Sequence, residues 1–144
     1  MPTITVGTAR IPYRIVGDGP DTLADDPVAF GRYATLTAFS RGFLNRIGRE
    51  AVEANTSYMQ PTPGTLRHIA LDLTLDLTPL LPRVQAPTLV IGCTQDATVP
   101  VENTRRLHAA LPTSTYTEFD TGHIAPAEEP AAFLKTVRDF FATA

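Results

Sequence analysis

The chain has 144 residues, which suits one compact domain, and 43% of them are hydrophobic, enough to build a core. Its net charge of -3 and charged fraction of 19% argue against nucleic-acid binding, which depends on clustered Lys and Arg. A single cysteine, Cys93, excludes an internal disulfide framework and a multi-cysteine metal site. No apolar run nears the ~20 residues that cross a bilayer, and no signal peptide is visible, so we expect a soluble cytoplasmic protein without membrane contact.

The N-terminal residues predict a β-hairpin. Thr3 to Val6 forms a short strand candidate, and the stretch from Ala9 to Val16 alternates polar and apolar residues as a strand does. Gly7-Thr8 between them suits a tight turn. The turn-forming residues 17–21 end the second strand.

The next sixty residues are mostly helical in pattern. From Pro27 to about Asn55 the apolar spacing is that of a helix, but Gly31 and Gly42 weaken it, so one helix or two helices with a break are equally compatible. The run from Pro61 to Gly64 is a firm break. Leu71 to Thr78 alternates strictly, which indicates a half-buried strand, whereas its leucine content favours helix and turn; the pattern leaves both open.

The last third predicts a strand–helix–strand–helix unit. Pro87 to Gly92 is a short apolar run of the kind found in buried parallel strands, and Pro100 opens a helix that ends before Pro112. Ser114 to Phe119 is a second strand, and Pro130 starts a final helix. We expect one apolar stripe on that helix, made of Phe133, Val137, Phe140 and Phe141. This alternation predicts a parallel sheet flanked by helices.

Two polar residues follow the two strands of this unit. Asp96 lies in the loop after the first strand, and His123 lies in the loop after the second. Because ligands gather at the carboxyl ends of parallel strands, we expect the two side chains to meet at one edge of the sheet. A carboxylate beside an imidazole fixes its tautomer and stabilises the imidazolium, so His123 would be usable as a general base or acid.

The segments around these residues carry a resemblance. Residues 81–141 resemble the C-terminal part of the α/β-hydrolase superfamily, and the opening residues 4–20 resemble its first hairpin. The middle, residues 27–80, is similar to the family's helical cap. The matching segments are Ala86 to Gly92, Asp96 with Val99-Pro100, and Gly122-His123 with Glu129-Pro130 and Phe133.

The resemblance implies an α/β fold in one domain over residues 1–144. The expected parts are the opening hairpin (1–20), the cap-like region (27–80) and the C-terminal parallel unit (81–144), a shortened α/β-hydrolase-like sheet. It also implies that Asp96 stands at the acid position of the catalytic triad and His123 at the histidine position. The family's central strands, oxyanion loop and Gly-x-Ser-x-Gly nucleophile elbow have no counterpart in this sequence, and a typical member is nearly twice as long.

Two other residues are weak nucleophile candidates. Ser40 satisfies a relaxed Ala-x-Ser-x-Gly motif, but no apolar strand precedes it, so a serine in a cap helix is the favoured interpretation. Cys93 lies three residues before Asp96 and fits better as a small buried residue at the end of a strand.

Aromatic residues of the cap-like region could line an apolar substrate pocket, although helical spacing more often indicates core; we single out Tyr33, Phe39 and Phe43. Of the remaining histidines, His108 lies on the apolar face of its helix and is expected to be structural, and His68 has no partner in sequence. The sequence shows no metal cluster, phosphate loop or dinucleotide fingerprint, so we expect no metal and no cofactor.

Three functions follow from these residues. The first is an acid–base enzyme without a covalent nucleophile, a lyase, cyclase or isomerase in which His123 and Asp96 move a proton on a small apolar metabolite. The second is an inactive hydrolase-like protein that binds a ligand or partner. The third is an esterase that uses Ser40 or Cys93. Because a sheet without its middle strands has exposed edges, we also expect a homodimer that completes the sheet.

Overall fold

The computed structural model describes residues 3–6, 9–12 and 26–143. At the N-terminus, β1 (Thr3–Val6) and β2 (Ala9–Pro12) pair antiparallel, with Val6 opposite Ala9, so the predicted hairpin pairing is confirmed. The predicted turn at Gly7-Thr8 and residues 13–16 of the predicted second strand lie outside the described residues.

Two helices occupy the region from Pro27 onward, as one of the two alternatives predicted. The helices α1 (Pro27–Ala38) and α2 (Arg41–Tyr58) pack against each other, and the break falls between the two glycines that weakened the pattern. Gly31 is tolerated inside α1 because it lies at the helix contact, where a Cβ would come within 2.4 Å of the Thr56 carbonyl oxygen. The glycine therefore sets how closely α1 and α2 approach.

The alternating stretch Leu71 to Thr78 is not a strand. The helix α3 (Pro63–Asp72) ends within it, a turn follows, and the 3-10 helix η1 (Thr78–Arg83) begins at its last residue. The backbone N–H groups of Thr74 and Leu75 donate to the Leu71 carbonyl at 2.9 Å, which satisfies them locally. A strand would have required a neighbouring strand to accept these bonds.

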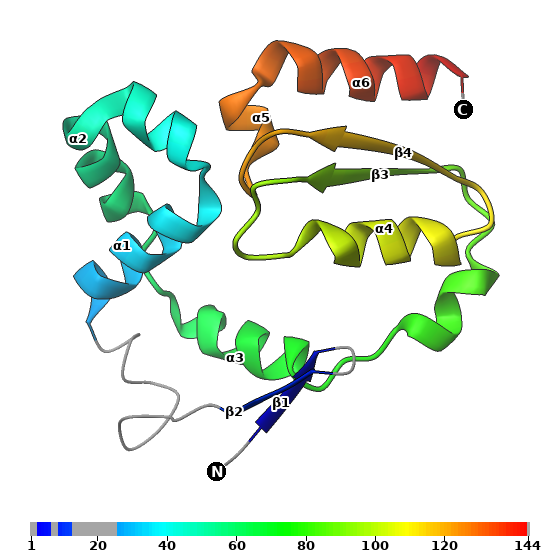
Figure 1. Ribbon diagram of the computed structural model, residues 1–144, viewed down its shortest axis with the longest axis horizontal. Helices are drawn as coiled ribbons and strands as arrows, with labels where there is room; N and C mark the ends of the chain where they lie inside the picture. The colour runs from blue at the N-terminus through cyan, green and yellow to red at the C-terminus, as the bar shows by residue number, and fades with distance from the viewer. Residues whose placement is uncertain (1–2, 7–8, 13–25, 144) are drawn as a thin grey trace.

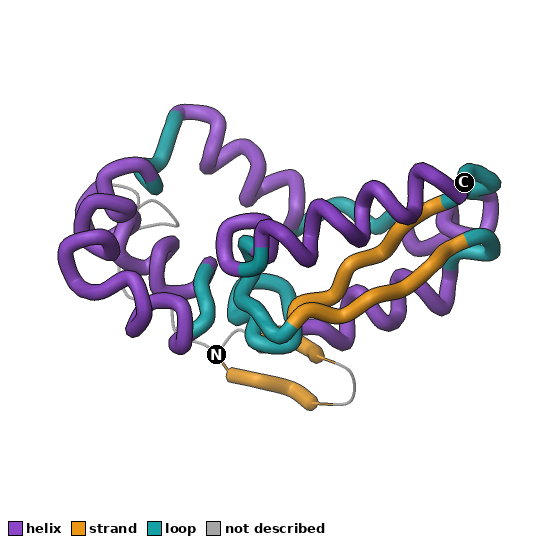
Figure 2. The backbone as a smooth tube through the Cα atoms, turned by 90° about the horizontal axis from the view of Figure 1, so that it is seen from above, coloured by secondary structure: helices purple, strands orange, loops and turns teal. Residues whose placement is uncertain are grey.

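The predicted strand–helix–strand–helix unit is present. Its elements are β3 (Thr88–Cys93), α4 (Val101–Ala110), β4 (Ser114–Phe119), a short α5 (Ala125–Glu128) and α6 (Pro130–Thr143). The strands pair in parallel, from Thr88 opposite Ser114 to Cys93 opposite Phe119. Figure 1 shows α4 on one face of the two strands and α6 on the other, and Figure 2 shows the same layering from above.

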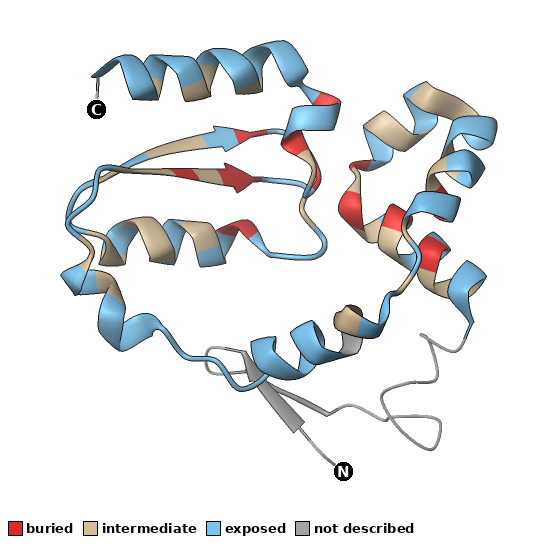
Figure 3. Ribbon diagram, turned by 180° about the vertical axis from the view of Figure 1, so that it is seen from behind, coloured by how far each residue is buried: buried red, intermediate tan, exposed pale blue. Residues whose placement is uncertain are grey.

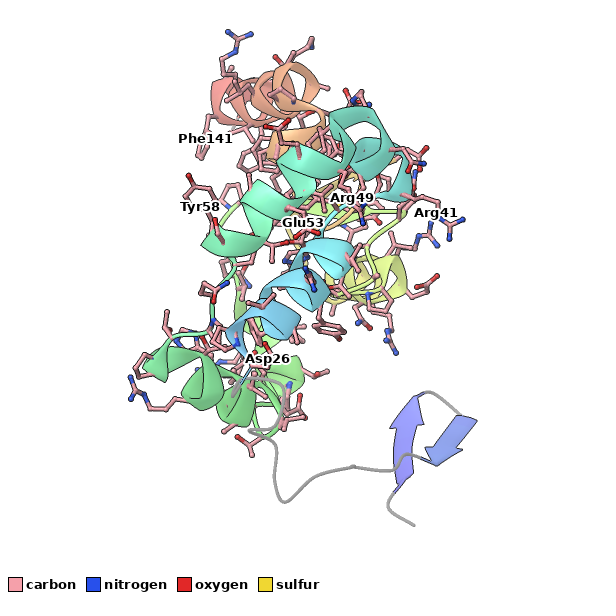
Figure 4. All side chains as sticks on the ribbon, turned by 90° about the vertical axis from the view of Figure 1, so that its left-hand side faces the viewer. Asp26, Arg41, Arg49, Glu53, Tyr58 and Phe141 are labelled. Carbon is pink, nitrogen blue, oxygen red and sulfur yellow. The ribbon has the colours of Figure 1, made fainter. Side chains whose placement is uncertain are left out.

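The core lies at the carboxyl ends of β3 and β4. Cys93, Phe119 and Ala125 form a buried cluster, and Phe133 of α6 packs against it with its ring 6.2 Å from that of Phe119. Buried residues in Figure 3 gather at these strand ends and on the facing parts of α1 and α2. The expected stripe on α6 is wrong for Phe141, which is 72% exposed and projects outward in Figure 4. Adjacent helical residues point about 100° apart, so Phe141 lies at the edge of the stripe and stays in solvent, whereas Phe133, Val137 and Phe140 are half-buried.

The strands aim their carboxyl ends at the α1–α2 pair. In Figure 1 both arrowheads point toward these two helices, and the loops that follow β3 and β4 lie between them and the sheet. In the described part of the chain, no helix is long and apolar enough to cross a membrane.

Candidate active site

Asp96 is fixed by its own loop. Its Oδ1 accepts hydrogen bonds from the backbone N–H groups of Thr98 at 2.7 Å and Val99 at 2.8 Å, closing a tight turn after β3. Its side chain is only 6% exposed. The second oxygen, Oδ2, is left to face the neighbouring loop.

His123 meets that second oxygen. Its Nδ1 lies 2.8 Å from Asp96 Oδ2, so the contact expected from the two strand ends is present. Because the carboxylate accepts, Nδ1 carries the proton, which leaves Nε2 as the basic nitrogen of the neutral ring. Nε2 has no hydrogen bond to any described residue, and the side chain is 42% exposed. The ring is therefore held at one nitrogen and open at the other.

The two loops are joined to each other beyond the strands. The backbone N–H of Thr94 donates to the Phe119 carbonyl at 2.9 Å, and that of Gln95 donates to the Thr121 carbonyl at 3.0 Å. The parallel hydrogen bonding of β3 and β4 thus continues into the loops that contain Asp96 and His123, the pair called the dyad below. This continuation explains why Asp96 and His123 meet although 27 positions separate them.

The junction between α1 and α2 contacts both loops. The Thr98 hydroxyl donates to the Thr37 carbonyl at 3.2 Å, and the Ile124 N–H donates to the Ala38 carbonyl at 3.2 Å. Gly122 packs so closely against this junction that a Cβ would lie 2.5 Å from the Ser40 nitrogen. The cap-like helices are thus docked on the Asp96 and His123 loops.

Ser40 and Cys93 have other surroundings. Ser40 follows a helix rather than a strand and caps α2: its hydroxyl accepts from the Phe43 N–H at 3.1 Å and donates to Glu128 Oε2 at 2.5 Å. Ser40 thus belongs to the cap-like helices, where it forms the N-cap of α2. Cys93 is buried in the core cluster at the end of β3. Among the described residues, no hydrogen bond joins either side chain to His123.

An open pocket of about 710 Å³ lies between the cap-like helices and the Asp96 loop. It is lined by Leu36, Phe39, Arg41, Leu44, Asn45, Gln95 and Ala97. Phe39 lines this pocket, and Phe43 stacks on it with ring centroids 5.1 Å apart. Tyr33 is 58% exposed on α1 and is not among the lining residues.

The remaining histidines stand apart from the dyad. His108 Nδ1 lies 2.7 Å from Ser114 Oγ, and its ring stacks on Tyr116 at 5.2 Å, which is the structural role that the sequence indicates. His68 is exposed on α3. Within the described residues, no group of three or more His, Cys, Asp or Glu side chains could hold a metal ion.

Asp120, in the loop after β4, accepts hydrogen bonds from two side chains of the loop after β3. Asp120 Oδ1 accepts from the Gln95 amide at 2.9 Å and the Thr94 hydroxyl at 2.7 Å. These two side-chain hydrogen bonds lower the pKa of Asp120. These same hydrogen bonds tie the loop after β4 to the loop after β3.

Sequence reasoning missed Glu128, whose buried side chain reaches the same loops. It ends the short α5, where Ala125, Pro126 and Ala127 precede it and only Ala125 is buried with it. Its partners lie up to 88 residues away in the sequence, so no local pattern could have revealed them.

Comparisons with known proteins match most of the chain. The family model described as TAP-like protein matches residues 74–144. Pyrrolizixenacetamide deacetylase from Xenorhabdus hominickii is 33% identical over 123 residues, which are 83% of this chain and 46% of that protein. The putative carbamate hydrolase RutD from Pseudomonas savastanoi pv. phaseolicola is 28% identical over 122 residues, 82% of this chain and 47% of the relative.

Solved structures also match most of the chain. The enol-lactonase from Burkholderia xenovorans superposes with a TM-score of 0.75 at 26% identity, covering 84% of this chain and 48% of that chain. The present chain spans about half the length of each of these relatives.

Proposed function

The chain is a member of the α/β-hydrolase superfamily, and we propose that it hydrolyses a small acyl compound with His123 and Asp96 activating water directly. The observation that carries the proposal is the 2.8 Å contact between His123 Nδ1 and Asp96 Oδ2, with Nε2 open. Relatives named as a deacetylase, a carbamate hydrolase and an enol-lactonase support a carbonyl substrate. The apolar side chains of Leu36, Phe39 and Leu44 in the neighbouring pocket support a substrate with an apolar part.

The proposed reaction has two proton transfers. His123 Nε2 takes a proton from water while the water oxygen forms a bond to the carbonyl carbon, giving a tetrahedral intermediate. Asp96 holds the Nδ1–H throughout and stabilises the imidazolium by its charge. The imidazolium then returns the proton to the leaving oxygen or nitrogen as the bond from carbon to that atom breaks. No covalent acyl-enzyme is formed in this scheme.

The test compares hydrolysis of p-nitrophenyl acetate by the wild-type chain with that by His123→Gln and Asp96→Asn. General acid–base catalysis contributes about 10²–10⁴-fold, so His123→Gln should lower the rate by about that factor. Asp96→Asn should also slow the reaction, because an amide at that position can present its NH₂ to Nδ1 and favour the wrong tautomer.

His68→Gln is the matched control, since it removes an exposed imidazole on α3 and should leave the rate unchanged. A His123→Gln variant that hydrolyses the ester as fast as the wild type would contradict the proposal. So would labelling by a fluorophosphonate or by iodoacetamide that disappears in Ser40→Ala or Cys93→Ala, because it would place a covalent nucleophile in the reaction.

A second function rests on the same dyad. A lyase, cyclase or isomerase that only moves a proton needs no nucleophile, and an imidazole open at Nε2 supplies one acid–base group. The two candidates differ in the fate of water: hydrolysis in ¹⁸O-water places the label in the acid product, whereas elimination or rearrangement does not. Binding of a substrate analogue without any turnover would instead favour the inactive binding protein.

A further inference from the structure

Glu128 is a buried carboxylate that the proposed reaction does not use. Glu128 is 7% exposed, and both of its carboxylate oxygens accept hydrogen bonds. Oε1 accepts from the backbone N–H of Ser40 at 2.7 Å and from that of Gly122 at 3.0 Å, and Oε2 accepts from the Ser40 hydroxyl at 2.5 Å. A buried carboxylate is costly unless its oxygens are paired, and here three donors pair them.

These bonds join two parts of the site that are distant in sequence. Ser40 caps the N-terminus of α2, and Gly122 directly precedes His123. The carboxylate therefore bridges the cap-like helices and the histidine loop. The Arg46 guanidinium adds to the bridge from α2 by donating to the Glu128 carbonyl at 3.3 Å.

Both peptide neighbours of His123 are held by this arrangement. The Gly122 N–H donates to Glu128, and on the other side the Ile124 N–H donates to the Ala38 carbonyl. The backbone of Gly122 also packs directly against the α1–α2 junction, because a Cβ at this position would lie 2.6 Å from the Phe39 carbonyl carbon. The backbone of His123 is thereby fixed from two directions, although its side chain is exposed.

We infer that Glu128 is a positioning residue: its carboxylate locks the histidine loop onto the α1–α2 junction and so orients the His123 ring toward Asp96. The catalytic part of this inference rests on the proposed function, but the orientation of the ring does not. Glu128 touches neither His123 nor Asp96 in any hydrogen bond of the described residues and acts through the backbone.

The first experiment observes the ring without any substrate. In the wild-type chain, NMR should show a downfield Nδ1–H proton for His123, assigned by its absence in His123→Gln. In Glu128→Ala, three donors lose their acceptor, and this signal should be broadened or lost. Glu128→Gln should keep it, because the amide oxygen can still accept from the Ser40 and Gly122 N–H groups.

The matched control is Glu129→Ala, which removes an exposed carboxylate one residue away and should leave the signal unchanged. If Glu128→Ala fails to fold, as judged by circular dichroism, Ser40→Ala replaces it. That variant deletes the bond to Oε2 together with the cap bond from the Phe43 N–H, and it should speed the exchange of the Nδ1–H proton. Ser57→Ala on the exposed side of α2 should not. A folded Glu128→Ala with the wild-type signal would overturn the inference, and so would a Ser40→Ala that behaves like Ser57→Ala.

The second experiment measures kinetics on p-nitrophenyl acetate. Because a misplaced catalytic group costs up to about 10²-fold, Glu128→Ala should lower kcat toward that extent. KM should stay within about twofold, and Glu128→Gln should restore most of kcat. Equal loss of kcat in Glu128→Ala and Glu128→Gln would contradict the inference. Absence of hydrolysis in the wild type would defeat the proposed function and leave the NMR result to decide on Glu128.

Discussion

Glu118 at the end of β4 accepts hydrogen bonds from two side chains at once. Arg105 of α4 donates through Nε at 2.7 Å, and the Tyr116 hydroxyl donates at 2.7 Å. These bonds, that from Arg105 first, lower the pKa of Glu118 to about 2. Burial of the phenol, together with its bond to Glu118, raises the pKa of Tyr116. The cluster therefore stays ionised at Glu118 and neutral at Tyr116 over a wide pH range.

The depressed pKa of Glu118 predicts how stability depends on acid. The group adds stability above its ordinary pKa of 4.5, and this contribution is lost as the pH falls toward about 2. Glu118→Gln should thus be less stable than the wild type at neutral pH, and the gap should close between pH 4.5 and 2. Urea unfolding across this range measures the gap.

Glu50→Gln, which alters an exposed carboxylate on α2, serves as the control and should follow the wild-type curve. A constant difference between Glu118→Gln and the wild type at all pH values would show that the Arg105 and Tyr116 contacts do not set the acid response.

The residues of the site differ in how far the sequence reveals them. Asp96 and His123 could be predicted to meet because each follows a strand of the same parallel pair, a relation that local patterns make visible. Glu128 could not, since its donors come from Ser40 and Gly122 through a tertiary contact. Ser40 lies between these cases: its short motif suggested a nucleophile, and the missing strand before it indicated the cap that the structure shows.

At the scale of elements, α2 contains two glycines with opposite roles. Gly42 lies in the first turn with open space around it, and a Cβ at this position would have the Ser40 hydroxyl oxygen as its nearest neighbour, at 4.0 Å. Gly48 has φ 78° and ψ 170°, a backbone conformation in which essentially only glycine is found, and it bends the helix. The same substitution should therefore change stability in opposite directions at the two sites.

Gly42→Ala should stabilise the chain by roughly 0.5–1 kcal/mol, because alanine loses less backbone entropy in a helix. Gly48→Ala should destabilise it by about 1–3 kcal/mol, although a Cβ there would meet no atom within 4 Å. Each variant is the control for the other in thermal or urea unfolding. Equal and small changes in the free energy of unfolding at both positions would show that an alanine at position 48 adopts the backbone conformation of Gly48 without strain.

The boundaries of helices and strands were hardest to predict from the sequence where tertiary contacts determine them. The alternation of Leu71 to Thr78 satisfies a strand pattern, but among the described strands none lies beside it, so local turns accept its backbone bonds. The break between α1 and α2 falls at Phe39 and Ser40, where docking on the Asp96 and His123 loops ends one helix and capping by Ser40 starts the next. By contrast, β3 was predictable because Pro87 precedes a short apolar run, and β4 because its Thr, Tyr and Phe residues favour strands and follow the break at Pro112.

The whole molecule leaves two kinds of surface uncovered. The strands β3 and β4 pair with each other and with no other described strand, so each keeps one open edge. The segment 69–80 exposes a run of large apolar side chains, between 42% and 80% exposed: Ile69, Leu71, Leu73, Leu75, Leu77 and Leu80. Open strand edges and an apolar segment on one chain are complementary to the same features of a second copy.

We therefore propose a homodimer in which the segment 69–80 is buried. Analytical ultracentrifugation of the wild-type chain at micromolar concentration should give a dimer, and Leu73→Asp combined with Leu77→Asp should give a monomer. Leu134→Asp, which charges an equally exposed leucine on α6, is the matched control and should remain dimeric. A compact wild-type monomer at this concentration would rule out the assembly.

The anchoring of the histidine loop also has a consequence for its dynamics. Surface loops usually exchange their amide hydrogens with solvent quickly, since nothing but water accepts from them. The amides of Gly122 and Ile124 instead donate inward, to the buried carboxylate of Glu128 in α5 and to the Ala38 carbonyl at the end of α1. These two amides should open only when the helices and the sheet part from each other. His123 thus stands in contact with solvent on a segment that unfolds with the interior.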